Sequence, residues 1–169
     1  ISWGGYWIDR LVKDDGLRDR IRKERKSKGQ PDGDKNYDVT VITPTYRRDP
    51  KVISRCIDCV RLQTFSGSVE HIICSDGERE DAVSSLVDEV GSDDVIYVHT
   101  DKRVDGDYGN NVRSEMLARA RGKYVLFLDD DNVILPKYLE VMVSDLAVKD
   151  GHYAICSVVH FGPLNPDVL

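Results

Sequence analysis

Residues 124–131 of the chain are Tyr-Val-Leu-Phe-Leu-Asp-Asp-Asp. The apolar run predicts a strand that is buried on both faces, as in the middle of a parallel sheet. Asp129, Asp130 and Asp131 follow at its end, where three adjacent carboxylates repel one another unless a cation lies among them. Because carboxylate oxygens suit Mg²⁺ or Mn²⁺, this strand end is a candidate metal site. An acidic turn that caps the next helix is the alternative.

Short apolar runs and amphipathic stretches alternate along residues 38–159. Strands that alternate with helices in this way are typical of an α/β domain with a mostly parallel sheet. Right-handed crossovers then place helices on both faces of the sheet. We expect strands at 39–42, 71–74, 95–98, 124–128 and 154–159, and helices at 52–60, 83–90, 112–120 and 136–146.

The N-terminal region differs in composition from this domain. Residues 5–28 are charged and carry a thin apolar stripe, which predicts a helix, and residues 29–34 are rich in helix breakers. We therefore divide the chain into a charged helix with its linker, residues 1–34, and an α/β domain, residues 35–169. The helix either packs on the domain, connects to another domain, or touches a membrane surface or a partner through its basic residues.

Composition narrows the class of protein. A chain of 169 residues with 40% hydrophobic residues suits one domain with a core of its own. Residues 31–169 contain fifteen basic and twenty-five acidic residues, which argues against a nucleic-acid-binding surface. No apolar stretch reaches membrane-spanning length. Four cysteines are too few for a disulfide framework, so we expect reduced thiols and a cytoplasmic location.

Polar residues follow three of the expected strands. They are residues 43–48 after the first strand, 75–77 after the second and 129–132 after the fourth. In open α/β sheets ligands bind beyond the carboxyl ends of the strands, so these segments predict a binding site at one edge of the sheet. His160 follows the last expected strand and is a further candidate metal ligand. The absence of GxGxxG and GxxxxGK[ST] motifs argues against a dinucleotide site and a P-loop.

Several segments, taken together and in this order, resemble family 2 glycosyltransferases, which have the GT-A fold. Residues 39–47 (Val-Thr-Val-Ile-Thr-Pro-Thr-Tyr-Arg) resemble the opening of that family, and residues 62–65 (Leu-Gln-Thr-Phe) resemble the end of its first helix. Residues 75–77 (Ser-Asp-Gly) resemble its D-D-G segment. Residues 112–131 resemble its A-R-N…A-x-G-x-Y-hydrophobic-D-x-D block. The resemblance covers approximately residues 38–140.

The resemblance implies that the protein uses a nucleotide-sugar donor, with UDP as the expected nucleotide. It implies transfer of the sugar, with inversion, to an acceptor hydroxyl of a glycan, a lipid or a small molecule. Pro44, Thr45 and Tyr46 match the loop that lies against the base and ribose. Asp76 matches the aspartate that binds the base, and a carboxylate can accept the imide N–H of uracil.

The resemblance also implies a divalent metal, Mg²⁺ or Mn²⁺. Asp129 and Asp131 match the ends of the D-x-D motif, with Asp131 as the direct ligand, and Asp130 is placed near the ribose or sugar. Arg113 matches the arginine near the diphosphate, where its planar fork suits phosphate. A surface ion pair is the alternative role for Arg113.

The sequence departs from the family pattern in places. Ser75 stands where the family has Asp, Glu78 where it has Ser, and Ser114 where it has Asn. The family's general base has no match before Leu169, so we expect a domain without the C-terminal acceptor segment. Two interpretations follow: part of a longer glycosyltransferase, or a non-catalytic module that binds nucleotide-sugars. A nucleotidyltransferase would need a Gly-rich loop at residues 43–46 and is disfavoured.

Overall fold

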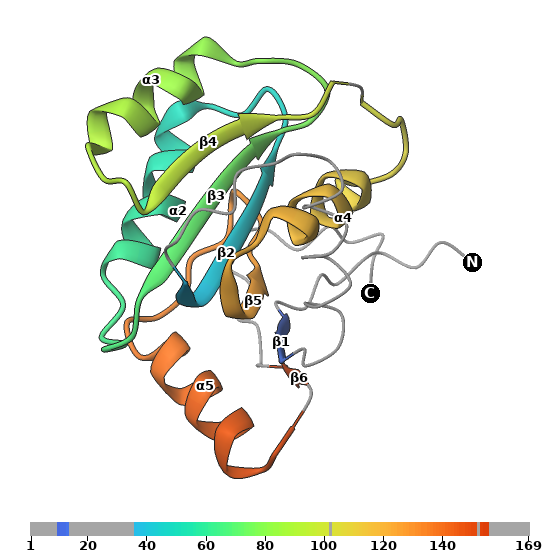
Figure 1. Ribbon diagram of the computed structural model, residues 1–169. Helices are drawn as coiled ribbons and strands as arrows, with labels where there is room; N and C mark the ends of the chain where they lie inside the picture. The colour runs from blue at the N-terminus through green and yellow to red at the C-terminus, as the bar shows by residue number, and fades with distance from the viewer. Residues whose placement is uncertain (1–9, 14–35, 102, 152, 156–169) are drawn as a thin grey trace, which may run out of the picture.

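A six-stranded sheet forms the centre of the protein in a computed structural model that describes residues 10–13, 36–101, 103–151 and 153–155. The strand order is β4-β3-β2-β5-β1-β6 (Figure 1). Four adjacent strands are parallel, namely β2 (Tyr37–Thr45), β3 (Val69–Ser75), β4 (Val95–His99) and β5 (Gly122–Phe127). The helices are α2 (Pro50–Arg61), α3 (Asp81–Val90), α4 (Asn110–Arg119) and α5 (Tyr138–Val148). The predicted alternation of strands and helices between residues 39 and 146 is confirmed.

Helices cover both faces of the sheet, as predicted. Along β2 the side chain of Val41 faces one way and packs in a cluster with residues of α2 and α5, whereas Ile42 faces the other way and packs against α4. Helix α3 lies on the same side as α2, where both contact Ile73 of β3 (Figure 1). The strand predicted to be buried on both faces is buried: Leu126 on one face is 0% exposed and Val125 on the other 8%.

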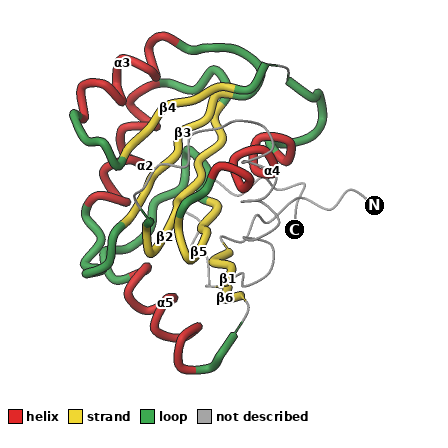
Figure 2. The backbone as a smooth tube through the Cα atoms, viewed as in Figure 1, coloured by secondary structure: helices red, strands yellow, loops and turns green. Residues whose placement is uncertain are grey.

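The prediction of a helix across residues 5–28 is wrong for Arg10–Lys13. These residues form strand β1, which pairs antiparallel with β5 in the register Leu11↔Leu126. Strand β6 (Tyr153–Ile155) pairs with the other edge of β1 (Figure 2). An open sheet edge offers a row of backbone donors and acceptors, and pairing with it outweighs a weak helical pattern. The rest of the expected helix, its linker and residues 156–159 of the expected last strand lie outside the described residues.

Local signals explain where the helices begin and end. Asp49 caps α2, because its Oδ1 accepts a hydrogen bond from the Lys51 N–H at 2.9 Å, and Pro50 occupies the first turn. Gly91 ends α3 in the left-handed conformation, with φ of 62°. Pro136 was expected in the first turn of the last helix but lies in a turn that precedes it, since α5 begins at Tyr138.

A buried polar network joins three strands at their amino ends. Glu70 of β3 is fully buried, and its Oε1 lies 2.6 Å from Nη2 of Arg121. Its Oε2 accepts a hydrogen bond from Thr40 Oγ1 at 2.7 Å, and Thr40 Oγ1 in turn accepts one from the Gly122 N–H at 2.7 Å. A Cβ at Gly122 would lie 2.2 Å from the Thr40 nitrogen, so only glycine lets β2 and β5 approach this closely. The network fixes the strands whose opposite ends carry the candidate site.

Candidate functional site

A cleft of about 430 Å³ lies at the carboxyl ends of β2, β3 and β5. Eight of the nine site residues predicted from the sequence line this cleft, and the ninth, His160, lies outside the described residues. The structure thus brings together three polar strand ends that the sequence holds up to 87 positions apart. The cleft is lined by Pro44, Thr45, Tyr46, Arg48, Asp76, Arg103, Val104, Gly106, Tyr108, Gly109, Arg113, Asp129, Asp130 and Asp131.

Two buried oxygen atoms in the cleft lack a hydrogen-bond partner among the described residues. They are Oδ1 of Asp76 and Oγ1 of Thr45. The backbone holds both residues in place, because the Asp76 N–H donates to the Thr45 carbonyl at 2.9 Å. Burial raises the pKa of Asp76, and the nearby Arg103 partly opposes this shift. A buried acceptor without a partner is costly, so these atoms indicate a polar ligand that supplies a donor.

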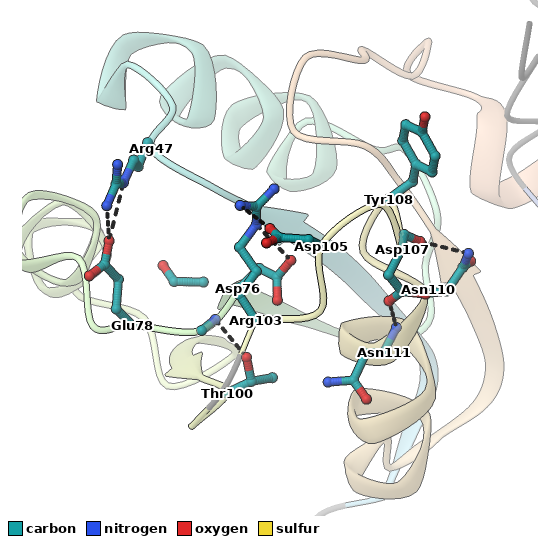
Figure 3. A network of polar contacts seen from close by, with 12 residues as sticks. Arg47, Asp76, Glu78, Thr100, Arg103, Asp105, Asp107, Tyr108, Asn110 and Asn111 are labelled. Atoms are coloured by element: carbon teal, nitrogen blue, oxygen red, sulfur yellow. Dashed lines mark hydrogen bonds and ion pairs between the residues drawn. The ribbon is translucent and has the colours of Figure 1, made fainter.

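Arg103, which the sequence did not single out, lies beside Asp76. Its Nε is 3.8 Å from Asp76 Oδ2, and its Nη1 is 2.8 Å from Asp105 Oδ1 (Figure 3). Its guanidinium carbon lies 4.0 Å from the centre of the Tyr46 ring, which is a cation–π distance. Gly77 permits this approach, because a Cβ there would lie 2.4 Å from Cβ of Arg103. The three side chains of Tyr46, Asp76 and Arg103 therefore form one end of the cleft.

The loop between β4 and α4 carries Arg103 and is tied to the sheet and the helix at its two ends. Thr100 Oγ1 accepts a hydrogen bond from the Gly77 N–H at 2.7 Å. The carboxylate of Asp107 accepts one from the Asn111 N–H at the start of α4 (Figure 3). Tyr108 follows with φ of 53°, and its side chain is 77% exposed at the border of the cleft. An exposed aromatic ring in this position is available to a ligand.

The acidic triplet forms the other end of the cleft, and arginine residues pair with all three of its members. Arg113 of α4 forms an ion pair with Asp129 and donates to the Tyr108 carbonyl at 2.7 Å. Burial raises the pKa of Asp129, and Arg113 opposes the shift. Arg113 therefore lies next to the acidic cluster, and its role at a diphosphate stays a prediction.

Arg48 was not predicted as a site residue, yet it bridges the other two carboxylates. Its Nε donates to Asp130 Oδ1 at 3.0 Å, and its Nη2 lies 3.2 Å from Asp131 Oδ2. Asp130 is 5% exposed, so this contact compensates a buried charge. The segment of residues 43–48 had been expected to reach the same edge of the sheet. Arg48 and Asp130 are 82 positions apart in the chain, so the local sequence does not reveal that they pair.

The triplet is also the candidate site for Mg²⁺ or Mn²⁺. The described residues contain no group of three His, Cys, Asp or Glu side chains arranged to surround a metal ion. Within the part of the chain that the structure describes, Oδ2 of Asp129 and Oδ1 of Asp131 accept no hydrogen bond, and both residues border the cleft. Two carboxylates that each keep one oxygen open fit a hard cation whose remaining ligands come from a substrate.

Comparison with known proteins identifies the class. A mostly parallel sheet with a cleft at the carboxyl ends of its strands is an open α/β domain with its ligand site in the usual place. The sequence profile of "Glycosyl transferase family 2" matches residues 40–166, which is most of the chain. The chain belongs to this family.

Individual relatives agree with the assignment. The chain is 28% identical over 125 residues to the UDP-Glc:alpha-D-GlcNAc-diphosphoundecaprenol beta-1,3-glucosyltransferase of Escherichia coli, with 71% of this chain and 47% of that protein covered. The fold is similar to S. aureus TarS 1-349 in complex with UDP-GlcNAc, at a TM-score of 0.56 and 21% identity over 66% of this chain and 31% of that one. It is also similar to a mannosyltransferase from Pyrobaculum calidifontis in complex with GDP-Man and Mn²⁺. That match has a TM-score of 0.55 and 20% sequence identity, and it covers 76% of this chain and 39% of that one.

These similarities establish a GT-A type of fold. The chain spans less than half the length of the curated relatives that it matches. Among the described helices none has the length and apolar character needed to cross a bilayer.

Proposed function

We propose that this domain binds the donor of a glycosyltransferase that moves a sugar from a UDP-sugar to an acceptor hydroxyl. The observation that carries the proposal is the buried Oδ1 of Asp76, which has no hydrogen-bond partner among the described residues and lies in the same cleft as the acidic triplet. At one end of the cleft a buried acceptor needs a hydrogen-bond donor, and at the other end the clustered carboxylates need cations. A nucleotide diphosphate with a divalent metal supplies both.

Uracil suits the end formed by Tyr46, Asp76 and Arg103. The carboxylate of Asp76 accepts the imide N–H of the base, and Arg103 donates to a flanking carbonyl oxygen. The ring of Tyr46 offers a face for stacking. Cytosine presents an acceptor where uracil presents the imide N–H, so a carboxylate at this position discriminates against it.

The diphosphate and the metal suit the other end. Asp129 and Asp131 would hold Mg²⁺ or Mn²⁺, and a divalent cation bound there stabilises negative charge on the leaving diphosphate. Arg113 lies next to Asp129, where it would donate to phosphate oxygens. Asp130, which also lines the cleft, would lie near the ribose or the sugar. These contacts orient the donor so that the acceptor hydroxyl attacks the anomeric carbon from the opposite face, with inversion.

The proposal for the acceptor rests on a relative of this chain. The name of the Escherichia coli protein specifies a diphosphoundecaprenol-linked acceptor. We therefore propose a lipid-linked glycan as acceptor here, with a general base that lies outside the residues assigned to the donor cleft. A cytoplasmic location and membrane contact through the basic N-terminal region belong to the same proposal.

Calorimetric titration with UDP, with and without Mn²⁺, tests the donor site. We expect UDP to bind with Mn²⁺ present, to bind at least tenfold more weakly without it, and to be preferred over CDP and GDP. Equal affinity for all three nucleotides, or no binding of UDP with Mn²⁺, would refute the proposal. Hydrolysis of UDP-sugars then separates an enzyme from a non-catalytic binding module, because an active transferase loses some sugar to water.

A further inference from the structure

Two neighbouring arginines leave the same loop in different directions. Arg47 adopts φ of 49°, in the left-handed region that non-glycine residues rarely occupy. Its guanidinium contacts Glu78, with Nη2 3.0 Å from Oε1. Its backbone N–H donates to Oε1 of Glu80 at 3.1 Å. Arg48, the next residue, instead reaches into the cleft and contacts Asp130 and Asp131. The backbone of Arg47 is thus held by its own N–H bond to Glu80, which a change of the Arg47 side chain leaves in place, and from there Arg48 reaches the triplet.

Arg48 and Arg113 together nearly neutralise the triplet. Three aspartates carry a charge of −3 and two arginines +2, which leaves −1 for the cluster of five side chains. A divalent cation that entered this cluster alone would face two guanidinium groups within the same few ångströms. Such like-charge contacts oppose its binding, and the effect is strong where the cluster is partly buried. Arg48 also occupies an oxygen of Asp131, the expected direct ligand.

We propose that Arg48 is an internal counter-ion of the triplet. It pairs with the triplet when the donor is absent, and this pairing is released when metal and nucleotide bind together. The inference rests on the proposed donor function. A diphosphate offers the guanidinium of Arg48 a new anionic partner at the same border of the cleft. Arg48 then releases Asp131 at a small cost in free energy, and the freed carboxylate oxygen becomes a ligand of the cation. Metal and nucleotide consequently bind cooperatively, and metal alone binds weakly.

Exchange of Arg48 for an uncharged residue tests this role without any assay of activity. Free Mn²⁺ is measured by electron paramagnetic resonance during titration of the wild-type protein, Arg48→Met and Arg47→Met. Arg47→Met is the matched control, because it removes an adjacent arginine that pairs with Glu78 instead of the triplet. Circular dichroism confirms that each variant is folded. Arg48→Lys keeps the charge but loses the fork that bridges two carboxylates, and it serves if Arg48→Met does not fold.

Without UDP we expect Arg48→Met to bind Mn²⁺ about tenfold more tightly than the wild type, Arg48→Lys about threefold, and Arg47→Met equally. With UDP the difference between the wild type and Arg48→Met shrinks, because UDP has already drawn Arg48 away. Unchanged Mn²⁺ affinity of both Arg48 variants without UDP would overturn the inference. The titrations without UDP decide this point on their own, so failure of UDP to bind any variant counts against the donor function and not against the role of Arg48.

Discussion

The guanidinium carbon of Arg103 lies 4.0 Å from the centre of the Tyr46 ring and its Nε lies 3.8 Å from the carboxylate of Asp76. Tyr46 follows the end of β2, whereas Arg103 belongs to the loop after β4. Strand β3 lies between these two strands, and Asp76 follows its end. The contact therefore closes one end of the cleft with side chains from three segments and makes Arg103 a candidate for reading the base.

Replacement of Arg103 by Ala is expected to weaken UDP binding about five- to tenfold, because one charged donor and one stacking partner are lost. Calorimetry with UDP and Mn²⁺ measures the change. Arg79→Ala is the control, since Arg79 pairs with Asp81 outside the cleft. Wild-type affinity in Arg103→Ala would show that the base does not contact this residue.

Replacement of Asp76 by Asn is expected to weaken UDP binding at least tenfold and to narrow the preference for UDP over CDP. The amide can donate to cytosine N3, which the carboxylate cannot do. The affinities of both nucleotides are compared with those of Asp105→Asn, which alters an exposed partner of the same Arg103. A preference for UDP as strong in Asp76→Asn as in the wild type would contradict the assigned role of Asp76.

His71 is expected to make folding stability depend on pH. The ring is fully buried, and its Nε2 lies 2.9 Å from Thr43 Oγ1. Burial lowers its pKa from 6.5 to about 3, so between these values the unfolded chain binds a proton that the folded protein does not. The free energy of unfolding therefore falls as pH falls through this window, by up to about 1.4 kcal/mol per pH unit.

Urea unfolding of the wild type and His71→Gln between pH 4 and pH 7 measures this dependence. The free energy of unfolding of the variant should fall less steeply toward acid than that of the wild type. Equal slopes for the wild type and His71→Gln would rule out His71 as the source.

Arg121→Met is expected to destabilise the protein by about 3 kcal/mol, because it leaves the buried carboxylate of Glu70 without its charged partner. The control is Arg119→Met, which breaks only a partly exposed pair with Glu115 on α4 and should cost less than about 0.5 kcal/mol. Chemical denaturation gives both values. Similar losses in the two variants would mean that the buried network contributes little.

The order of strands and helices and the place of the ligand site could be predicted from sequence because both depend on local patterns. The spacing of apolar residues separates a strand such as 124–128 from a helix such as 83–90. Parallel strands carry their carboxyl ends to one edge, so the polar segments that contain Pro44, Asp76 and Asp129 had to meet there. The composition of those segments was enough to identify the family.

Only the tertiary structure decided which charged groups pair and how the N-terminal region joins the sheet. Arg10–Lys13 forms a strand because the edge of β5 supplies backbone partners that no nearby residue reveals. Arg48 meets Asp130 across 82 positions of the chain, and Arg103 meets Tyr46 from a loop on another strand. Such contacts form only when distant segments pack together. Their contribution to the free energy of folding therefore arises only once the sheet has assembled.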